Sequence, residues 1–275
     1  VSTDWLYKNL DNVKIIDCSW HLPNQNRDSY NEFLKNHIPN SIFFDLDKYS
    51  DLTSDLPHML PDFKTWEKNI SSLGIKNNDR IIIYDNSDVL SSCRCWYNFI
   101  YFGHNPELVS VLDGGFKKWK LEKKTTTKEL KKYSKSKYVA QEVKTLVKNI
   151  EQIKINIKTK KFLVVDARSK DRFEGKEAEP RKNVRSGSIE NSFCLPYSEL
   201  IKKDNSFKSL NEIKTKFDQI LGPNHKKEIV FSCGSGITAA VLALAYTLIN
   251  NNYQHHCVTP VSTGFRCTIQ IWGLL

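Results

Sequence analysis

Cys233 is the residue of this sequence whose type and surroundings best suit nucleophilic chemistry. It follows an apolar run at residues 229–231 and is followed by Gly234 and Gly236, and then by a stretch of strong helix formers. This order predicts a strand, a tight loop and a helix whose N-terminus lies over the thiol. Backbone N–H groups and the helix dipole favour negative charge there, so the pattern predicts a thiolate that attacks sulfur or carbon.

The alternative for any free cysteine is a small buried hydrophobic residue. Cys93 and Cys95 fit that alternative, because Cys-x-Cys is the spacing neither of a thioredoxin-type redox pair nor of a usual zinc site. The segment 255–257, His-His-Cys, has ligand-type residues but no second ligand cluster at a suitable distance in the sequence. We therefore expect no metal and no cofactor.

The segments that would position Cys233 have counterparts in the first half of the chain. Residues 13–17 are matched in type by residues 162–166, and residues 81–85 by residues 229–233, each about 150 residues further on. All four are short apolar runs rich in β-branched side chains and without polar alternation. Such runs are typical of strands that are buried on both faces of a parallel sheet.

Stretches with helical spacing separate these runs, as at Trp66, Ile70 and Leu73. The alternation predicts an α/β protein with two similar domains, each a mainly parallel sheet flanked by helices. Ligands of such sheets bind beyond the carboxyl ends of the strands, where Cys233 ends one run and Asp85 ends the equivalent run. Only the second half has a nucleophile at this place.

We expect the first domain at residues 1–122, a basic linker at 123–137 and the second, catalytic domain at 138–275. A chain of 275 residues is long enough for two such domains, each with its own core. The net charge of +10 comes from an excess of lysine that is densest near the linker. The cluster lacks the interleaved aromatic residues and the arginine clusters that nucleic-acid recognition needs, so we expect a solvated linker and no nucleic-acid partner.

The longest nearly apolar run, residues 239–249, is too short to cross a bilayer, which predicts no membrane association. Seven cysteines, an odd number, form no regular disulfide framework and favour a reducing compartment. We therefore expect a soluble cytoplasmic protein. The sequence opens at Val1 rather than at a methionine, so a mitochondrial protein with a processed N-terminus stays an open alternative.

The loop from Cys233 to Thr238 resembles the active-site loop of the 3-mercaptopyruvate sulfurtransferases, which are two-domain rhodanese-like proteins. The resemblance extends over nearly the whole chain. Its other motifs are found at residues 17–23, 37–39, 43–47, 57–61, 111–116, 166–168, 172–175 and 179–181. It implies two tandem rhodanese-like domains, a first without a catalytic cysteine and a second that carries sulfur as a persulfide on Cys233.

The implied reaction moves sulfur from 3-mercaptopyruvate, a 2-oxo acid with a thiol, to a thiol or cyanide acceptor and releases pyruvate. A thiol protein such as thioredoxin is one acceptor that the resemblance suggests. Arg172 and Arg181 stand where similar proteins place substrate-binding arginines, and a guanidinium suits bidentate recognition of a carboxylate.

The resemblance also implies a proton relay of Ser235, His58 and Asp47, since the chemistry needs a proton donor for an enolate and an acceptor for a thiol proton. The remaining residues of the loop are expected to contact the substrate: Gly234, Gly236, Ile237 and Thr238.

Other functions stay open on the same fold. Thiosulfate sulfurtransferase is the nearest alternative, but similar enzymes have basic side chains in the loop where this chain has neutral Gly234 and Ser235. A phosphatase needs a longer loop that ends on an arginine, whereas this loop continues with Thr238 and Ala239. A carrier that holds a persulfide without turnover is the non-enzymatic alternative.

The segment 254–271 departs from the family's pattern, which returns only at the final Trp272-Gly273. Pro260 has no N–H to donate to a sheet ladder, so it does not suit the interior of a central strand. We expect a displaced last strand or an irregular cover here, and a catalytic domain that is less stable than the first.

Overall fold

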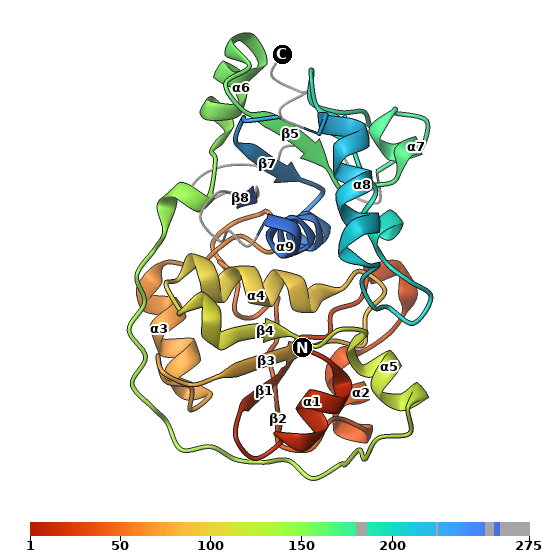
Figure 1. Cartoon of the computed structure of the whole chain (residues 1–275). Coiled ribbons are helices and arrows are strands. Elements are labelled where there is room, and N and C mark those ends of the chain that lie inside the picture. The colour runs from red at the N-terminus through yellow and green to blue at the C-terminus, as the bar shows by residue number, and fades with distance from the viewer. Residues whose placement is uncertain (180–185, 224, 251–255, 259–275) are drawn as a thin grey trace. The chain divides into compact units, whose positions relative to one another are not determined.

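The computed structural model of the chain describes residues 1–179, 186–223, 225–250 and 256–258 (Figure 1). The chain forms two compact units. The first unit comprises Val1–Leu52, Pro61–Val143 and Lys203–Phe207. The second unit comprises Thr53–Leu60, Lys144–Lys202 and Lys208–Leu275. One short segment of each half of the sequence therefore belongs to the other unit, and the segment taken from the first half contains His58.

The first unit is built on a parallel sheet with the strand order β2-β1-β3-β4. Its strands are β1 (Lys14–Asp17), β2 (Ser41–Phe43), β3 (Ile81–Tyr84) and β4 (Val109–Val111). The central strand β3 is buried along its whole length. Its unbroken apolar sequence is what a strand with packed elements on both faces requires.

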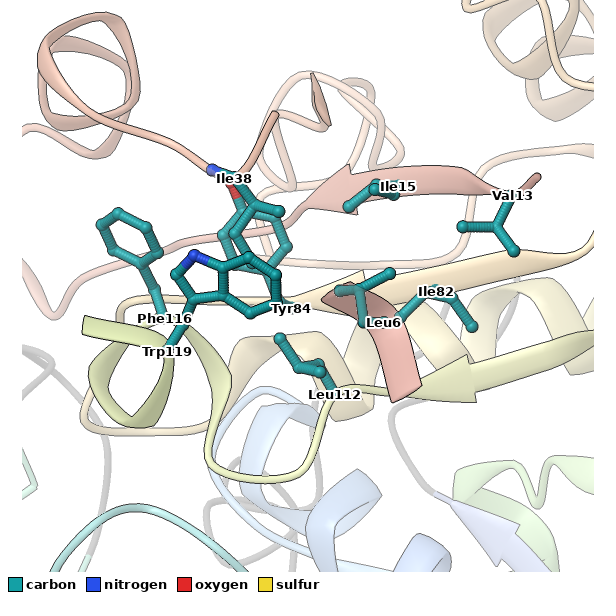
Figure 2. Packing of buried hydrophobic residues seen from close by; sticks show 9 residues of the cluster. All are labelled: Leu6, Val13, Ile15, Ile38, Ile82, Tyr84, Leu112, Phe116 and Trp119. Carbon is teal, nitrogen blue, oxygen red and sulfur yellow. Dashed lines mark hydrogen bonds between the residues drawn. The ribbon is translucent and has the colours of Figure 1, made fainter. Parts of the chain in front are cut away.

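The helices of the first unit are α1 (Thr3–Lys8), α2 (Ser29–Lys35), α3 (Phe63–Ser72), α4 (Ser91–Tyr101) and α5 (Gly115–Leu121), with short 3₁₀ turns at Pro23–Gln25 and Pro106–Leu108. The side chains of α1 and α5 pack on β1 and β3 in one apolar cluster (Figure 2). Its buried members are Leu6, Val13, Ile15, Ile38, Ile82, Tyr84, Leu112, Phe116 and Trp119. On α3, the predicted core residue Trp66 stacks on Phe102 at the end of α4.

The second unit repeats the sheet with the parallel strand order β6-β5-β7-β8. Its strands are β5 (Leu163–Asp166), β6 (Phe193–Cys194), β7 (Ile229–Ser232) and β8 (His256–Val258). Its helices are α6 (Ile150–Thr159), α7 (Lys170–Phe173), α8 (Leu210–Leu221) and α9 (Ile237–Asn250), with 3₁₀ turns at Lys144–Leu146 and Tyr197–Leu200.

The two sheets confirm the predicted α/β fold with two tandem domains. The first pair of repeated runs forms β1 and β5, which are second in the strand order of their sheets. The other pair forms β3 and β7, which are third. The order matches strand for strand, because each unit places its first strand beside the third and its second strand at an edge. Cys233 therefore follows β7 at the carboxyl edge of the second sheet, and Asp85 follows β3 at the carboxyl edge of the first.

Residues 124–143, which we call the strap, are hydrogen-bonded to the rest of the first unit. The backbones of Thr127 and His37 exchange two hydrogen bonds of 2.9 Å, and the Gln141 N–H donates to the Phe102 carbonyl at 3.0 Å. The predicted linker at 123–137 lies almost wholly within this strap, and it groups with the first unit. These pairings join residues that are far apart in the sequence, so the lysine-rich composition does not reveal them.

Within the described ranges, no helix is long and apolar enough to cross a membrane. The atypical segment 254–271 and Pro260 lie outside the described residues, apart from the backbone of β8.

Candidate active site

The loop after β7 holds the predicted nucleophile at the start of α9. The Cys233 thiol is buried, and the Gly236 N–H donates to its sulfur at 3.1 Å. Gly236 has a φ of 83°, which a residue with a side chain rarely adopts, and this conformation turns its N–H inward. The sulfur thus receives a backbone N–H at the N-terminal end of a fourteen-residue helix, an arrangement that stabilises negative charge.

The rest of the loop is compact and without charged side chains. Ser235 is buried, Gly234 and Thr238 are half-buried, and Ile237 is a buried residue at the first position of α9. The structure therefore places all six predicted loop residues around one strand end. Their assigned contacts with substrate stay predictions.

Four charged residues form a network after the neighbouring strand β5. Arg168 donates from Nη2 to Asp166 Oδ2 at 2.7 Å and from Nη1 to Glu179 Oε1 at 2.6 Å. The predicted substrate residue Arg172 donates from Nε to the same Glu179 oxygen at 3.2 Å and from Nη2 to the second oxygen at 2.5 Å. Burial acts to lower the pKa of Arg168, but its bonds and charge interactions with Asp166 and Glu179 outweigh burial and raise it.

This network and the Cys233 loop lie at the same edge of the second sheet. Asp166 and Ser232 are register partners in the adjacent parallel strands β5 and β7, and the Ala167 N–H donates to the Ser232 carbonyl at 2.8 Å. Arg172 lies on α7, directly after β5. The second predicted arginine, Arg181, lies outside the described residues.

The predicted relay residues His58 and Asp47 belong to different units. His58 is buried and has a φ of 58°, a left-handed conformation that costs a residue with a side chain energy and is found preferentially at functional positions. Asp47 accepts hydrogen bonds from the indole N–H of Trp20 at 3.2 and 3.0 Å. The relay itself remains a prediction, and the Trp20 contact to its acid was not anticipated.

The equivalent loop of the first unit contains the carboxylate of Asp85 instead of a thiol. Asp85 Oδ1 accepts from the N–H and the hydroxyl of Ser87, both at 3.0 Å, and Oδ2 accepts from the Ser92 N–H at 2.7 Å. Burial raises the pKa of Asp85, although these donors act against the rise. The first unit therefore has a buried acid at the N-terminus of α4 and no nucleophile there.

Three of the other described cysteines, Cys18, Cys93 and Cys194, are poorly suited to form thiolates. Cys93 and Cys95 are fully buried on α4, as the packing interpretation predicted. Burial raises the pKa of the Cys18 and Cys93 thiols well above the usual range, and it raises the pKa of Cys194 to about 11. In the part of the chain that the structure describes, no group of three or more His, Cys, Asp or Glu side chains could hold a metal ion.

Sequence reasoning proposed the loop and Arg172 as site residues, which stay predictions, and it did not anticipate Glu179 as the shared partner of two arginines. The signal available was an Asp-x-Arg sequence directly after a predicted strand, Asp166 and Arg168, which is typical of a local ion pair. Nothing in the spacing indicated that Glu179 returns to this pair from eleven residues further on.

The comparisons with known proteins agree with this geometry. The family described as Rhodanese-like domain matches residues 2–122 and 149–266. A relative in Arabidopsis thaliana, thiosulfate/3-mercaptopyruvate sulfurtransferase 1, mitochondrial, is 38% identical over 267 residues, which cover 89% of this chain and 70% of the relative. The 3-mercaptopyruvate sulfurtransferase of Escherichia coli is 32% identical over 253 residues, which cover 91% of this chain and 89% of the relative.

A solved structure shows the same likeness in three dimensions. The crystal structure of SseA from Escherichia coli, described as a 3-mercaptopyruvate sulfotransferase with the rhodanese fold, superposes with a TM-score of 0.86 at 28% sequence identity. The match covers 96% of this chain and 98% of that chain.

Proposed function

The chain belongs to the rhodanese-like family, and on that premise we propose that it is a 3-mercaptopyruvate sulfurtransferase that carries sulfur as a persulfide on Cys233. The observation that carries this proposal is the Gly236 N–H on the Cys233 sulfur at the start of α9. An N–H and a helix terminus stabilise a thiolate before the transfer and a persulfide anion after it.

The proposed reaction has two halves. In the first, the Cys233 thiolate attacks the sulfur of 3-mercaptopyruvate, a sulfur–sulfur bond forms, and the carbon–sulfur bond breaks. The electrons of the broken bond pass to an enolate, which takes up a proton and leaves as pyruvate. In the second, an acceptor thiolate or cyanide attacks the outer sulfur of the persulfide, and the Cys233 thiolate is released again.

In this proposal, the remaining site residues bind the charged substrate or supply a proton. Arg172 and Arg181 bind the carboxylate of the substrate, because a guanidinium can donate charge-assisted hydrogen bonds to a carboxylate. Ser235, His58 and Asp47 supply the proton for the enolate. The left-handed backbone conformation of His58 supports its role, because this conformation is costly to maintain without a function.

Thiosulfate sulfurtransferase is the second candidate, and the name of the Arabidopsis relative includes both donors. The loop favours mercaptopyruvate, because Gly234 and Ser235 offer no positive side chain to a small dianion. We expect slow turnover of thiosulfate beside the main reaction. The acceptor is proposed to be a small thiol or a thiol protein such as thioredoxin, in the cytoplasm, although the Arabidopsis relative is described as mitochondrial.

Pyruvate release from 3-mercaptopyruvate in the presence of a thiol is the test of this function. The wild-type chain should turn over, and mass spectrometry after incubation without acceptor should find one added sulfur on Cys233. Cys233→Ser should lose both signals, whereas the buried control Cys93→Ser should keep them. Sulfur loading without pyruvate turnover would instead indicate a carrier, and an adduct that persists in full after Cys233→Ser would exclude the assigned nucleophile.

A further inference from the structure

Glu179 is the most deeply buried member of the charged network at the edge of the second sheet. Its side chain is 2% exposed, compared with 22% for the side chain of its partner Arg172. Among the described residues, one oxygen accepts from both Arg168 and Arg172, and the other accepts from Arg172. A carboxylate removed from water in this way needs two guanidinium partners to offset its lost hydration.

The contacts fix both the direction and the free donors of Arg172. Its Nε and Nη2 atoms are used by Glu179, so Nη1 is the one nitrogen of this guanidinium without a hydrogen-bond partner among the described residues. An incoming anion can therefore meet the remaining N–H groups, two on Nη1 and one on Nη2, at an angle that Glu179 fixes.

The network is also electrically balanced. Asp166 and Glu179 contribute two negative charges, and Arg168 and Arg172 contribute two positive charges. The buried position of Glu179 leaves its charge little screened by water. In the first unit, Arg27 and Glu32 form a similar fork, but the Glu32 side chain is 32% exposed and is screened by solvent.

We infer that Glu179 is a specificity-determining residue that acts through Arg172 and selects a monoanionic sulfur donor over a dianionic one. The inference rests on the proposed function, in which Arg172 meets the carboxylate of mercaptopyruvate. Mercaptopyruvate has one negative charge and thiosulfate has two. The negative charge of Glu179 therefore repels thiosulfate twice as strongly at the same distance.

Two effects of removing this charge change the donor preference in the same direction. The loss of one buried negative charge favours a dianion over a monoanion by about tenfold at a separation of about 12 Å and an effective dielectric constant of about 20. The released Arg172 side chain loses its fixed direction, which weakens the directional contact with a carboxylate. Both effects raise the ratio of thiosulfate to mercaptopyruvate efficiency.

The test compares kcat/KM for both donors in the full chain carrying Glu179→Gln, which keeps the shape of the side chain and removes its charge. The thiosulfate-to-mercaptopyruvate ratio should rise about tenfold. Glu177→Gln is the matched control, because Glu177 is exposed and its side chain bonds only Ser169 among the described residues; its ratio should stay at the wild-type value. An unchanged or lower ratio in Glu179→Gln overturns the inference.

Glu179→Asp separates charge from folding. It keeps the negative charge and shortens the side chain, so the ratio should stay within about threefold of wild type. A tenfold rise in this variant overturns the inference, because charge would then not set the ratio. The rate at which iodoacetamide, an uncharged reagent, alkylates Cys233 at the high-pH plateau of its pH profile should match wild type in both variants and reports an intact loop.

The proposed function and this inference fail in different ways. If the wild-type chain releases no pyruvate from mercaptopyruvate, the function is wrong whatever the variants do. If wild type turns over and Glu179→Gln leaves the ratio unchanged, only the role of Glu179 is wrong.

Discussion

The two units have the same strand order, but different residues lie between the equivalent strand and helix. Asp85 precedes α4 in the first unit, and Cys233 precedes α9 in the second. In the first unit, the Asp85 carboxylate accepts three hydrogen bonds from Ser87 and Ser92 and fills the loop with a fixed internal charge. In the second unit, the equivalent position holds the Cys233 sulfur, which can accept a further atom. A strand end and helix start that stabilise an anion can thus serve structure in one unit and chemistry in the other.

A second pair of equivalent residues, Asp17 and Asp166, differs in the groups that bond the carboxylate. Asp17 ends β1 and Asp166 ends β5, and both are buried. Asp17 accepts from the N–H and the hydroxyl of Ser19, at 2.9 and 2.5 Å, and burial raises its pKa to about 6. Asp166 is instead paired with Arg168. The comparison shows that one buried acid is held by a neutral hydroxyl and the other by a permanent cation.

The largest expected effect comes from breaking the ion pair of the second unit. Asp166→Asn leaves the buried Arg168 guanidinium with too little negative charge, which should lower the local free energy of unfolding by about 4 kcal/mol. Hydrogen exchange of the β5 amides measures this local value. Asp171→Asn, at an exposed position of α7, is the control. A loss below about 1 kcal/mol would show that Glu179 alone can neutralise Arg168.

The equivalent change in the first unit should have the opposite sign. The folded pKa of Asp17 lies above its ordinary value of 3.8, so the native state binds more protons between about pH 4 and 6 and stability falls as pH rises through this window. Above it, the buried charge costs about 3 kcal/mol.

Asp17→Asn should therefore raise the free energy of unfolding of the first unit by about 3 kcal/mol at pH 8 and by about 0.5 kcal/mol near pH 4. Hydrogen exchange of the β1 amides at the two pH values gives both numbers. Destabilisation at pH 8 would mean that the Ser19 bonds need a full charge and that the two acids are equivalent after all.

The two arginine–glutamate pairs, Arg172–Glu179 and Arg27–Glu32, allow the two units to be compared by enzymatic activity. Arg172→Ala should lower kcat/KM for mercaptopyruvate about 30-fold, since one charge-assisted hydrogen bond contributes about 2 kcal/mol. Arg27→Ala, in the fork of the first unit, should change it less than about twofold, because that unit has no nucleophile. Steady-state pyruvate release measures both. Equal losses in the two variants would contradict a carboxylate-binding role that belongs to Arg172 and not to Arg27.

The smallest expected effect concerns the helices α3 and α8, which precede the central strand of each sheet. Asp62 caps α3 by accepting from the N–H groups of Lys64 and Thr65, and Ser209 caps α8 in a reciprocal pair with Glu212. Asp62→Ala and Ser209→Ala should each cost about 1 kcal/mol of local stability. Hydrogen exchange within each helix compares them, and a difference above about 1 kcal/mol would show that the two caps are not equivalent.

The strands could be predicted because their information is local. The runs at 13–17 and 229–233 are rich in apolar β-branched residues, and they contain β1 and β7. Trp66 and Ile70 are fully buried as their spacing predicts, whereas Leu73 lies past the last residue of α3 and is only half-buried. Helical periodicity predicts a buried face but not the residue at which the helix ends.

The site could be predicted only in part, for a physical reason. Cys233 could be proposed from its own neighbours, since a strand, two glycines and a helix former follow one another in the sequence. The partners of Glu179 and the Trp20 bond to Asp47 depend on which side chains meet after folding. Residue type gives the charge of a group, but the group that compensates it is set by tertiary structure.

The strap has a consequence for proteolysis. By composition it is an attractive trypsin substrate, since Lys128, Lys131, Lys132 and Lys135 follow one another closely and are exposed. A protease, however, needs several residues of free, extended backbone in its cleft. The pairing of this backbone with the first unit, at Thr127 and again at Gln141, withholds that conformation until the strap separates from the unit. Cleavage between the two domains is therefore governed by a local opening equilibrium rather than by the density of lysines.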